Sequence, residues 1–134
     1  MDLKLELPSN LYEDLRKHKA LSIIEEITND KNFISVDLYD IEAFKDKSII
    51  ERIDYKNNES IPKVDIYPQS IIACLTIPLT TTLSEINIEV EKIMKTFNTK
   101  DIVFGTTTDK NIKDKTIGIT CLLFRNLEWN KINI

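Results

Sequence analysis

The sequence predicts an α+β domain with a mixed four-stranded sheet and helices packed on one face. The continuously apolar, β-branched run of residues 71–77 is typical of a buried central strand, and residues 116–124 predict a second apolar strand. Between them, residues 82–97 carry apolar side chains at helical spacing, and residues 48–55 alternate apolar and polar positions. Two successive strands, then a helix and then a hairpin favour this fold class.

The N-terminal part of the chain is expected to be mainly helical. Residues 2–7 alternate in character and predict a short edge strand or a tail. Asn10 and Glu13 have the spacing of a capping box, and apolar residues then recur near the helical period, so one helix is predicted over 11–28. A loop and a short helix over 40–47 follow.

The middle of the chain is expected to supply two strands and the main helix. Strands are predicted over 48–55 and 71–77, joined by a proline-containing loop. Thr82 and Glu85 have capping-box spacing at the start of the helix. Its apolar stripe is predicted to pack on the sheet. The stripe consists of Leu83, Ile86, Val90, Ile93, Met94 and Phe97.

Two more strands are predicted near the C-terminus. Residues 101–108 and 116–124 are separated by a polar turn, so we expect them to pair as a hairpin. Residues 125–134 are expected to form an extended tail or an edge strand, in which Trp129 packs.

Length and charge exclude several classes of protein. The 134 residues suit one domain, residues 1–134. A net charge of -4 gives no basic face for a nucleic-acid partner. No apolar run approaches the ~20 residues of a transmembrane helix, and the start lacks a signal-peptide core. The chain is therefore expected to be cytoplasmic, without membrane insertion.

The content of glycine, cysteine and histidine argues against a cofactor site. Gly105 and Gly118 are the only glycines, and a phosphate-binding loop needs several close together, so no nucleotide binding is expected. Cys74 and Cys121 lie in apolar segments and are expected to be buried. One histidine, His18, is too few for a zinc cluster, so we expect no metal, no cofactor and no enzyme activity of the chain alone.

The stretch "NFISVDLYDIEAF", residues 32–44, places Asp37 and Asp40 three residues apart before the predicted short helix. One interpretation is structural, because an acid at a helix start accepts from free N–H groups and favours the helix dipole. The other is presentation to a ligand or partner. We expect Asp40 to cap the helix and Asp37 to serve a partner, since Asp37 lies outside the capping reach of a helix over 40–47.

Three segments, in order, resemble the FtsZ branch of the tubulin superfamily. "IVFGTTTDKNIKDKTIGITCLLF" resembles the final hairpin of that family. "IIACLTIPLTTTLSEINIEVEKIM" resembles the strand, loop and helix that come before it, with Leu83, Glu85, Ile86 and Asn87 at motif positions. The resemblance covers roughly residues 20–124.

The third segment, "ISVDLYDIEAF", resembles the synergy loop of the family, whose core is Asn-x-Asp-x-x-Asp. Asp37 and Asp40 match the two acids, and Ser35 stands in place of the asparagine. In this family one subunit binds GTP, and the synergy loop of the next subunit brings carboxylates to the γ-phosphate. The resemblance thus implies catalytic roles for Asp37 and Asp40 only in trans, and partner binding by Ser35, Asp37, Leu38 and Asp40.

The resemblance implies a stand-alone C-terminal domain like that of FtsZ and tubulin. Residues 10–29 would be the lead-in helix, residues 30–47 the synergy-like loop with its short helix, and residues 48–134 the sheet–helix core. The GTP-binding domain of the family has no counterpart in this sequence. GTP would reach the chain only when a partner subunit holds it.

Three functions remain open at this point. The first is an interaction module that binds an FtsZ-like GTPase subunit or associates with itself, which the lack of a phosphate loop favours. The second is a trans-acting GTPase activator that supplies Asp37 and Asp40 to a partner's nucleotide site. The third is a repurposed α+β binding module unrelated to cell division. GTP turnover by a partner filament separates the first two, and the third predicts no co-sedimentation with such filaments.

Overall fold

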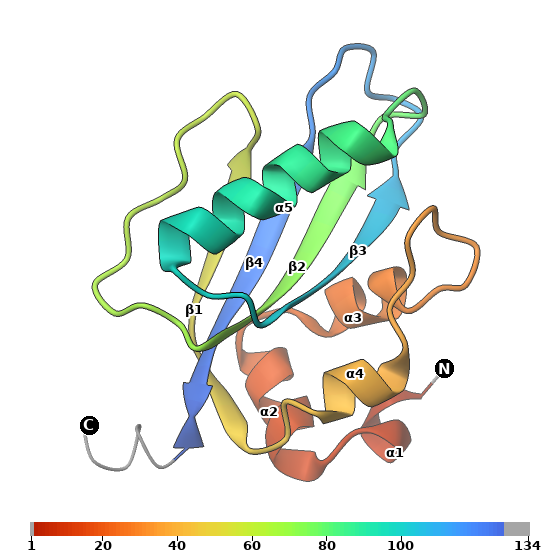
Figure 1. The fold of residues 1–134 in the computed structure, drawn as a ribbon. Helices are drawn as coiled ribbons and strands as arrows, with labels where there is room; N and C mark the ends of the chain where they lie inside the picture. Colours follow the sequence, from red (N-terminus) through yellow and green to blue (C-terminus); the bar gives the residue numbers. More distant parts are fainter. Residues whose placement is uncertain (1, 128–134) are drawn as a thin grey trace.

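The fold was analysed in a computed structural model that describes residues 2–127, and it confirms the α+β class (Figure 1). In chain order the elements are α1 (Leu3–Glu6), α2 (Ser9–Lys17), α3 (Leu21–Ile27), α4 (Leu38–Glu42), β1 (Lys47–Lys56), β2 (Ser70–Ile77), α5 (Leu83–Phe97), β3 (Ile102–Thr108) and β4 (Gly118–Asn126). Within this part of the chain, no helix is both long enough and apolar enough to cross a membrane.

The strands form the predicted mixed four-stranded sheet, in the order β1-β4-β2-β3. β4 is antiparallel to both β1 and β2, and β3 is parallel to β2. The predicted hairpin between the last two strands is therefore wrong, because β2 lies between them. β4 is apolar on both faces and gains two neighbours in this central position, and the connection after β3 is long enough to pass the end of β2.

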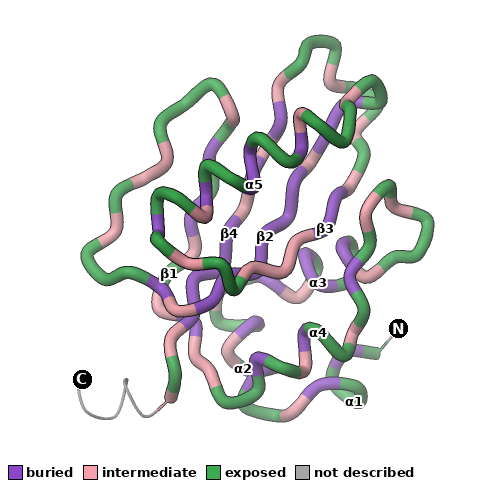
Figure 2. The backbone as a smooth tube through the Cα atoms, viewed as in Figure 1, coloured by how far each residue is buried: buried purple, intermediate pink, exposed green. Residues whose placement is uncertain are grey.

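Helices cover both faces of the sheet, not one face as predicted. α5 lies across one face, and α1 to α4 gather on the other side (Figure 1). The α5 core includes Ile53, Ile71, Ala73, Leu75, Ile86, Val90, Ile93, Phe97, Ile119, Cys121 and Leu123. The N-terminal core includes Leu3, Leu7, Leu11, Leu15, Ile24, Ile27, Val36, Ile41, Phe44, Ile49, Ile72, Cys74, Leu122 and Phe124. Alternate residues of β2 and β4 enter different cores. β2 is buried except at Thr76, and β4 is buried at Ile119 and from residue 121 to 124 (Figure 2).

The N-terminal layer differs from its prediction at both of its first two elements. Residues 2–7 form a helical turn, α1, because the Asp2 side chain accepts from the Lys4 N–H and Leu3 is buried against other helices. The predicted helix over 11–28 is broken into α2 and α3. Lys19 has a left-handed φ of 55° at the break.

The break is held by a contact with the sheet. Arg52 Nη1 on β1 donates to the carbonyl oxygens of His18 and Lys19, at 3.0 and 2.9 Å. The predicted capping box also fails, because α2 begins at Ser9. The Asn10 side chain instead donates to the Lys45 carbonyl, and Glu13 accepts from Arg16. The Asn10 contact is tertiary and the Glu13 contact lies within α2. The three-residue spacing of Asn10 and Glu13 could not distinguish these contacts from a capping box.

The α5 helix agrees closely with its prediction. Thr82 Oγ1 accepts from the Glu85 N–H at 3.2 Å, and Glu85 Oε1 accepts from the Thr82 N–H at 3.1 Å, which completes the capping box. These hydrogen bonds from Thr82 hold the pKa of Glu85 below its ordinary value. Ile86, Val90, Ile93 and Phe97 are buried. Leu83, by contrast, is the first residue of α5 and is 52% exposed, so this end of the predicted stripe does not belong to the core.

The two cysteines are buried, as expected, and each is a free thiol. Cys74 belongs to the N-terminal core and Cys121 to the α5 core, so they lie on opposite faces of the sheet. Burial raises the pKa of Cys74 to about 11 and that of Cys121 to about 12. The tail predicted from residue 125 begins inside β4, and Trp129 lies outside the described residues.

Candidate protein-interaction surface

The segment between α3 and α4 is hydrogen-bonded to the outer edge of β3, the strand at one end of the sheet. Ile34 N donates to Thr106 Oγ1 at 3.0 Å, and Thr106 N donates to the Ile34 carbonyl at 2.9 Å. Two residues later, Val36 N donates to the Ile27 carbonyl at 2.8 Å. Ile34 packs against the α5 core and Val36 belongs to the N-terminal core, so the chain crosses the sheet edge here.

Gly105 makes this crossing sterically possible. A Cβ atom at this position would lie 2.8 Å from Ile27 Cβ and 3.1 Å from Val36 Cγ2. The end of α3 and the following segment therefore approach β3 more closely than a side chain on residue 105 would allow. The glycine found inside the predicted strand has this packing role.

Asp37 is the N-cap of α4, and this reverses the roles expected from sequence. Its Oδ1 accepts from the Tyr39 N–H at 2.9 Å, because α4 begins at Leu38 and not near residue 40. Asp40 lies in the first turn of the helix. Within residues 2–127, its carboxylate makes no hydrogen bond or ion pair. Asp40 is thus the acid without a structural partner, and Asp37 has a structural task.

We refer to Ser35, Asp37, Leu38 and Asp40 as the loop–helix surface. Ser35, Asp37 and Asp40 are exposed, whereas Leu38 is half-buried against the N-terminal core. Tyr39 between them is 79% exposed, and sequence reasoning did not select it. Tyrosine is enriched in protein interfaces relative to the rest of the protein surface. An exposed Tyr39 beside two acids therefore favours a recognition site.

A depression of about 180 Å³ lies next to this surface. It is lined by Glu6, Asp37, Leu38, Tyr39 and Glu42. Three carboxylates around an aromatic and an aliphatic side chain suit a cationic side chain of a partner, by charge attraction and cation–π contact. Glu6 was not predicted, because residues 2–7 were expected to form an edge strand or a tail. Within residues 2–127, no group of three or more His, Cys, Asp or Glu side chains is arranged to hold a metal ion.

Comparison with known proteins gives matches only at the level of structure. No protein-family model and no curated protein sequence matches this chain. A point mutant of FtsZ from M. jannaschii matches with a TM-score of 0.61 and 16% sequence identity, over 90% of this chain and 42% of that one. An empty FtsZ dimer from M. jannaschii matches with a TM-score of 0.59 and 16% identity, over 88% of this chain and 40% of that one.

The chain has the fold of the FtsZ C-terminal domain. This confirms the fold expected from the three segments that resemble FtsZ. The chain spans only about two fifths of the length of the FtsZ structures that it matches, which are covered to 42% and 40%. At 16% identity the likeness to FtsZ concerns the fold alone, so activity and partners require a separate argument.

Proposed function

We propose that this chain is an interaction module that binds an FtsZ-like GTPase subunit, or a second copy of itself, through the loop–helix surface. It holds no GTP of its own and contributes at most half of a shared nucleotide site. The observation that carries the proposal is the FtsZ C-terminal fold together with exposed Asp37 and Asp40 in the segment that resembles the synergy loop.

The attachment of this segment supports a binding role. Hydrogen bonds from Ile34 and Val36 anchor the chain just before the exposed residues, and the Asp37 cap fixes the start of α4. A surface that is already ordered loses little conformational entropy when a partner binds. The acids and Tyr39 are then held in one arrangement, which favours a specific partner over non-specific attraction.

Co-sedimentation with filaments of a full-length FtsZ-like GTPase tests the proposal. The wild-type chain is expected in the pellet, and Asp40→Asn and Asp37→Asn are expected to weaken its recovery. Asn keeps the capping oxygen at position 37, so loss of binding there reports the charge and not the helix. Asp65→Asn, in the exposed loop before β2, is the matched control. Equal recovery of all variants, or none of the wild type, would reject the proposed surface.

GTPase activation is a second candidate, and the free carboxylate of Asp40 favours it. A carboxylate without an internal partner can orient a water molecule or a cation at a phosphate held by another subunit. If the chain activates its partner, GTP turnover rises on addition of the wild type and not on addition of Asp40→Asn. Unchanged turnover with intact co-sedimentation indicates binding alone. Sedimentation velocity of the chain by itself tests association of two copies.

A further inference from the structure

The sheet has two edge strands, and β1 is protected against pairing with another strand. A bulge interrupts its register between Ile49 and Glu51. Asp14 Oδ2 accepts from the Ile49 N–H at 2.7 Å, and Glu59 Oε1 accepts from the Lys56 N–H at 2.7 Å. Charged side chains follow along the strand. Bulges, charges and occupied main-chain donors are the usual means by which an edge strand avoids a further partner.

The outer edge of β3 lacks this protection over its first half. Thr106 N donates outward to Ile34, and residues two apart in a strand direct their main-chain groups the same way. Ile102 and Phe104 therefore present N–H and C=O groups outward. Within the described residues these groups have no hydrogen-bond partner. β3 contains no charged residue and no proline, so nothing in its sequence opposes an added strand.

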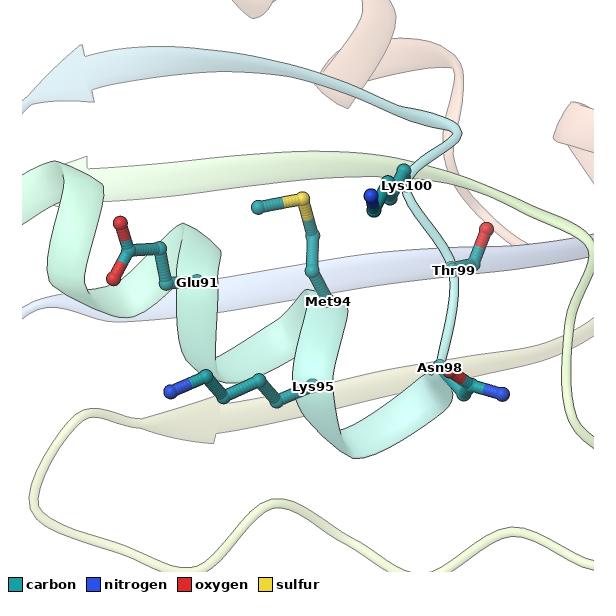
Figure 3. A pocket seen from close by; sticks show the side chains of 6 residues that line it. All are labelled: Glu91, Met94, Lys95, Asn98, Thr99 and Lys100. Carbon is teal, nitrogen blue, oxygen red and sulfur yellow. The ribbon is translucent and has the colours of Figure 1, made fainter.

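An open groove lies beside this edge, between the end of α5 and the segment that leads into β3 (Figure 3). Its volume is about 400 Å³. The Met94 side chain points from α5 toward the strands, and Lys100 lies on the segment before β3 (Figure 3). Met94 is the apolar side chain that lines the groove. Ile102 and Phe104, on the strand that follows, are half-buried on the same face of the sheet as Met94.

The net charge of the residues that line the groove is positive, whereas that of the whole chain is negative. Lys95 and Lys100 outnumber Glu91 among the lining residues, while the chain carries a net charge of -4. An acidic side chain in an occupant is attracted here. The crossing segment at Thr106 also limits the free edge to a short stretch. A single extended segment can enter such a stretch, whereas the edge of a folded sheet needs a longer free strand.

We propose that the outer edge of β3 binds an extended segment of another protein as an added strand. Its main chain pairs with Ile102 and Phe104, an apolar side chain lies in the groove against Met94, and an acidic side chain lies beside Lys95 or Lys100. This is strand addition, in which main-chain hydrogen bonds give affinity and side-chain pockets give selectivity. The site is separate from the loop–helix surface and does not depend on the function proposed for it.

Selection from a phage-displayed library of random peptides on the full chain tests the proposal. Enriched peptides are expected to alternate apolar and polar residues and to contain an acid. The affinity of the best synthetic peptide is then measured by fluorescence anisotropy. Ile102→Pro removes an outward N–H without removing a bond to β2, and it should weaken binding about tenfold, the effect of one lost hydrogen bond in a partly dry site. The thermal midpoint of the variant shows that it is folded.

Two further changes separate strand addition from other modes of binding. A peptide with N-methyl groups on the amides that face β3 should lose at least as much affinity, and it leaves the protein unchanged. Lys100→Glu should weaken binding of the acidic peptide severalfold, whereas Lys17→Glu on α2 should not. If no peptide is enriched above background, or the selected peptide binds Ile102→Pro as tightly as the wild type, the proposal is overturned.

Discussion

At the scale of single residues, Asp37 and Asp40 have exchanged the roles that their spacing predicted. Asp37 caps α4, so Asp37→Ala should lower the free energy of unfolding by about 0.5–2 kcal/mol. Asp40 has no internal partner in the described part of the chain, so Asp40→Ala should change the free energy of unfolding by less than about 0.5 kcal/mol. Urea denaturation measures both changes. Equal losses for the two variants would contradict the assignment of the cap.

Gly105 gives a second prediction at this scale. An added Cβ would lie 2.8 Å from Ile27 Cβ and 3.2 Å from the Ile27 carbonyl, so α3 must move away from β3. Gly105→Ala should therefore reduce the free energy of unfolding by about 1–3 kcal/mol. Gly118→Ala is the control, since its nearest neighbour would be Thr76 Cβ at 3.6 Å. A similar stability for the two variants would show that α3 adjusts without cost.

The buried thiols predict a dependence of stability on pH. Burial raises the pKa of Cys74 to about 11 and that of Cys121 to about 12, while the thiols of the unfolded chain have a pKa of about 8.5. The neutral thiols thus give full stability below that value, and stability falls as the pH rises through the raised pKa values. Urea denaturation between pH 8 and 10 should show this decline. Cys74→Ala and Cys121→Ala should each make the slope shallower.

At the scale of elements, α5 was predictable because its signals are local. The capping box and the helical spacing of its buried residues lie within one continuous segment. Ile93 is fully buried in the α5 core, so Ile93→Ala should cost about 2–5 kcal/mol of stability. Leu83→Ala, at the exposed start of the same helix, should cost little. Comparable losses at both positions would place Leu83 in an interface of the assembled protein.

The elements that sequence reasoning missed depend on contacts between distant residues. The break between α2 and α3 needs Arg52 of β1 to donate hydrogen bonds to the carbonyl oxygens of His18 and Lys19, and no sequence pattern near Lys19 shows this. α1 forms because Leu3 and Leu7 are covered by the other N-terminal helices. Apolar alternation in so short a segment fits a strand as well as a helical turn.

At the scale of the whole molecule, the resemblance to FtsZ led to the correct fold, while local patterns alone did not give the order of the strands. The apolar sequence pattern of a buried strand such as β4 is the same whether its neighbour in the sheet is β3 or β2. The same limit applies to the candidate site. Asp37 was visible in the sequence, but Glu6 joins it at the depression only because α1 and α4 are brought together in the N-terminal layer.

The last prediction concerns nucleotide binding by the chain as a whole. Both glycines lie in strands, Gly105 against α3 and Gly118 at the start of β4, so neither can open a loop around phosphates. The start of α5, the longest helix of the described part, is already satisfied by Thr82 and Glu85, and the Glu85 carboxylate repels an anion there. Titration of the isolated chain with a fluorescent GTP analogue should therefore show no saturable binding at micromolar concentrations, under conditions where a full-length FtsZ saturates. Saturation of this chain, displaced by unlabelled GTP, would mean that it binds nucleotide through a site other than a glycine-rich loop.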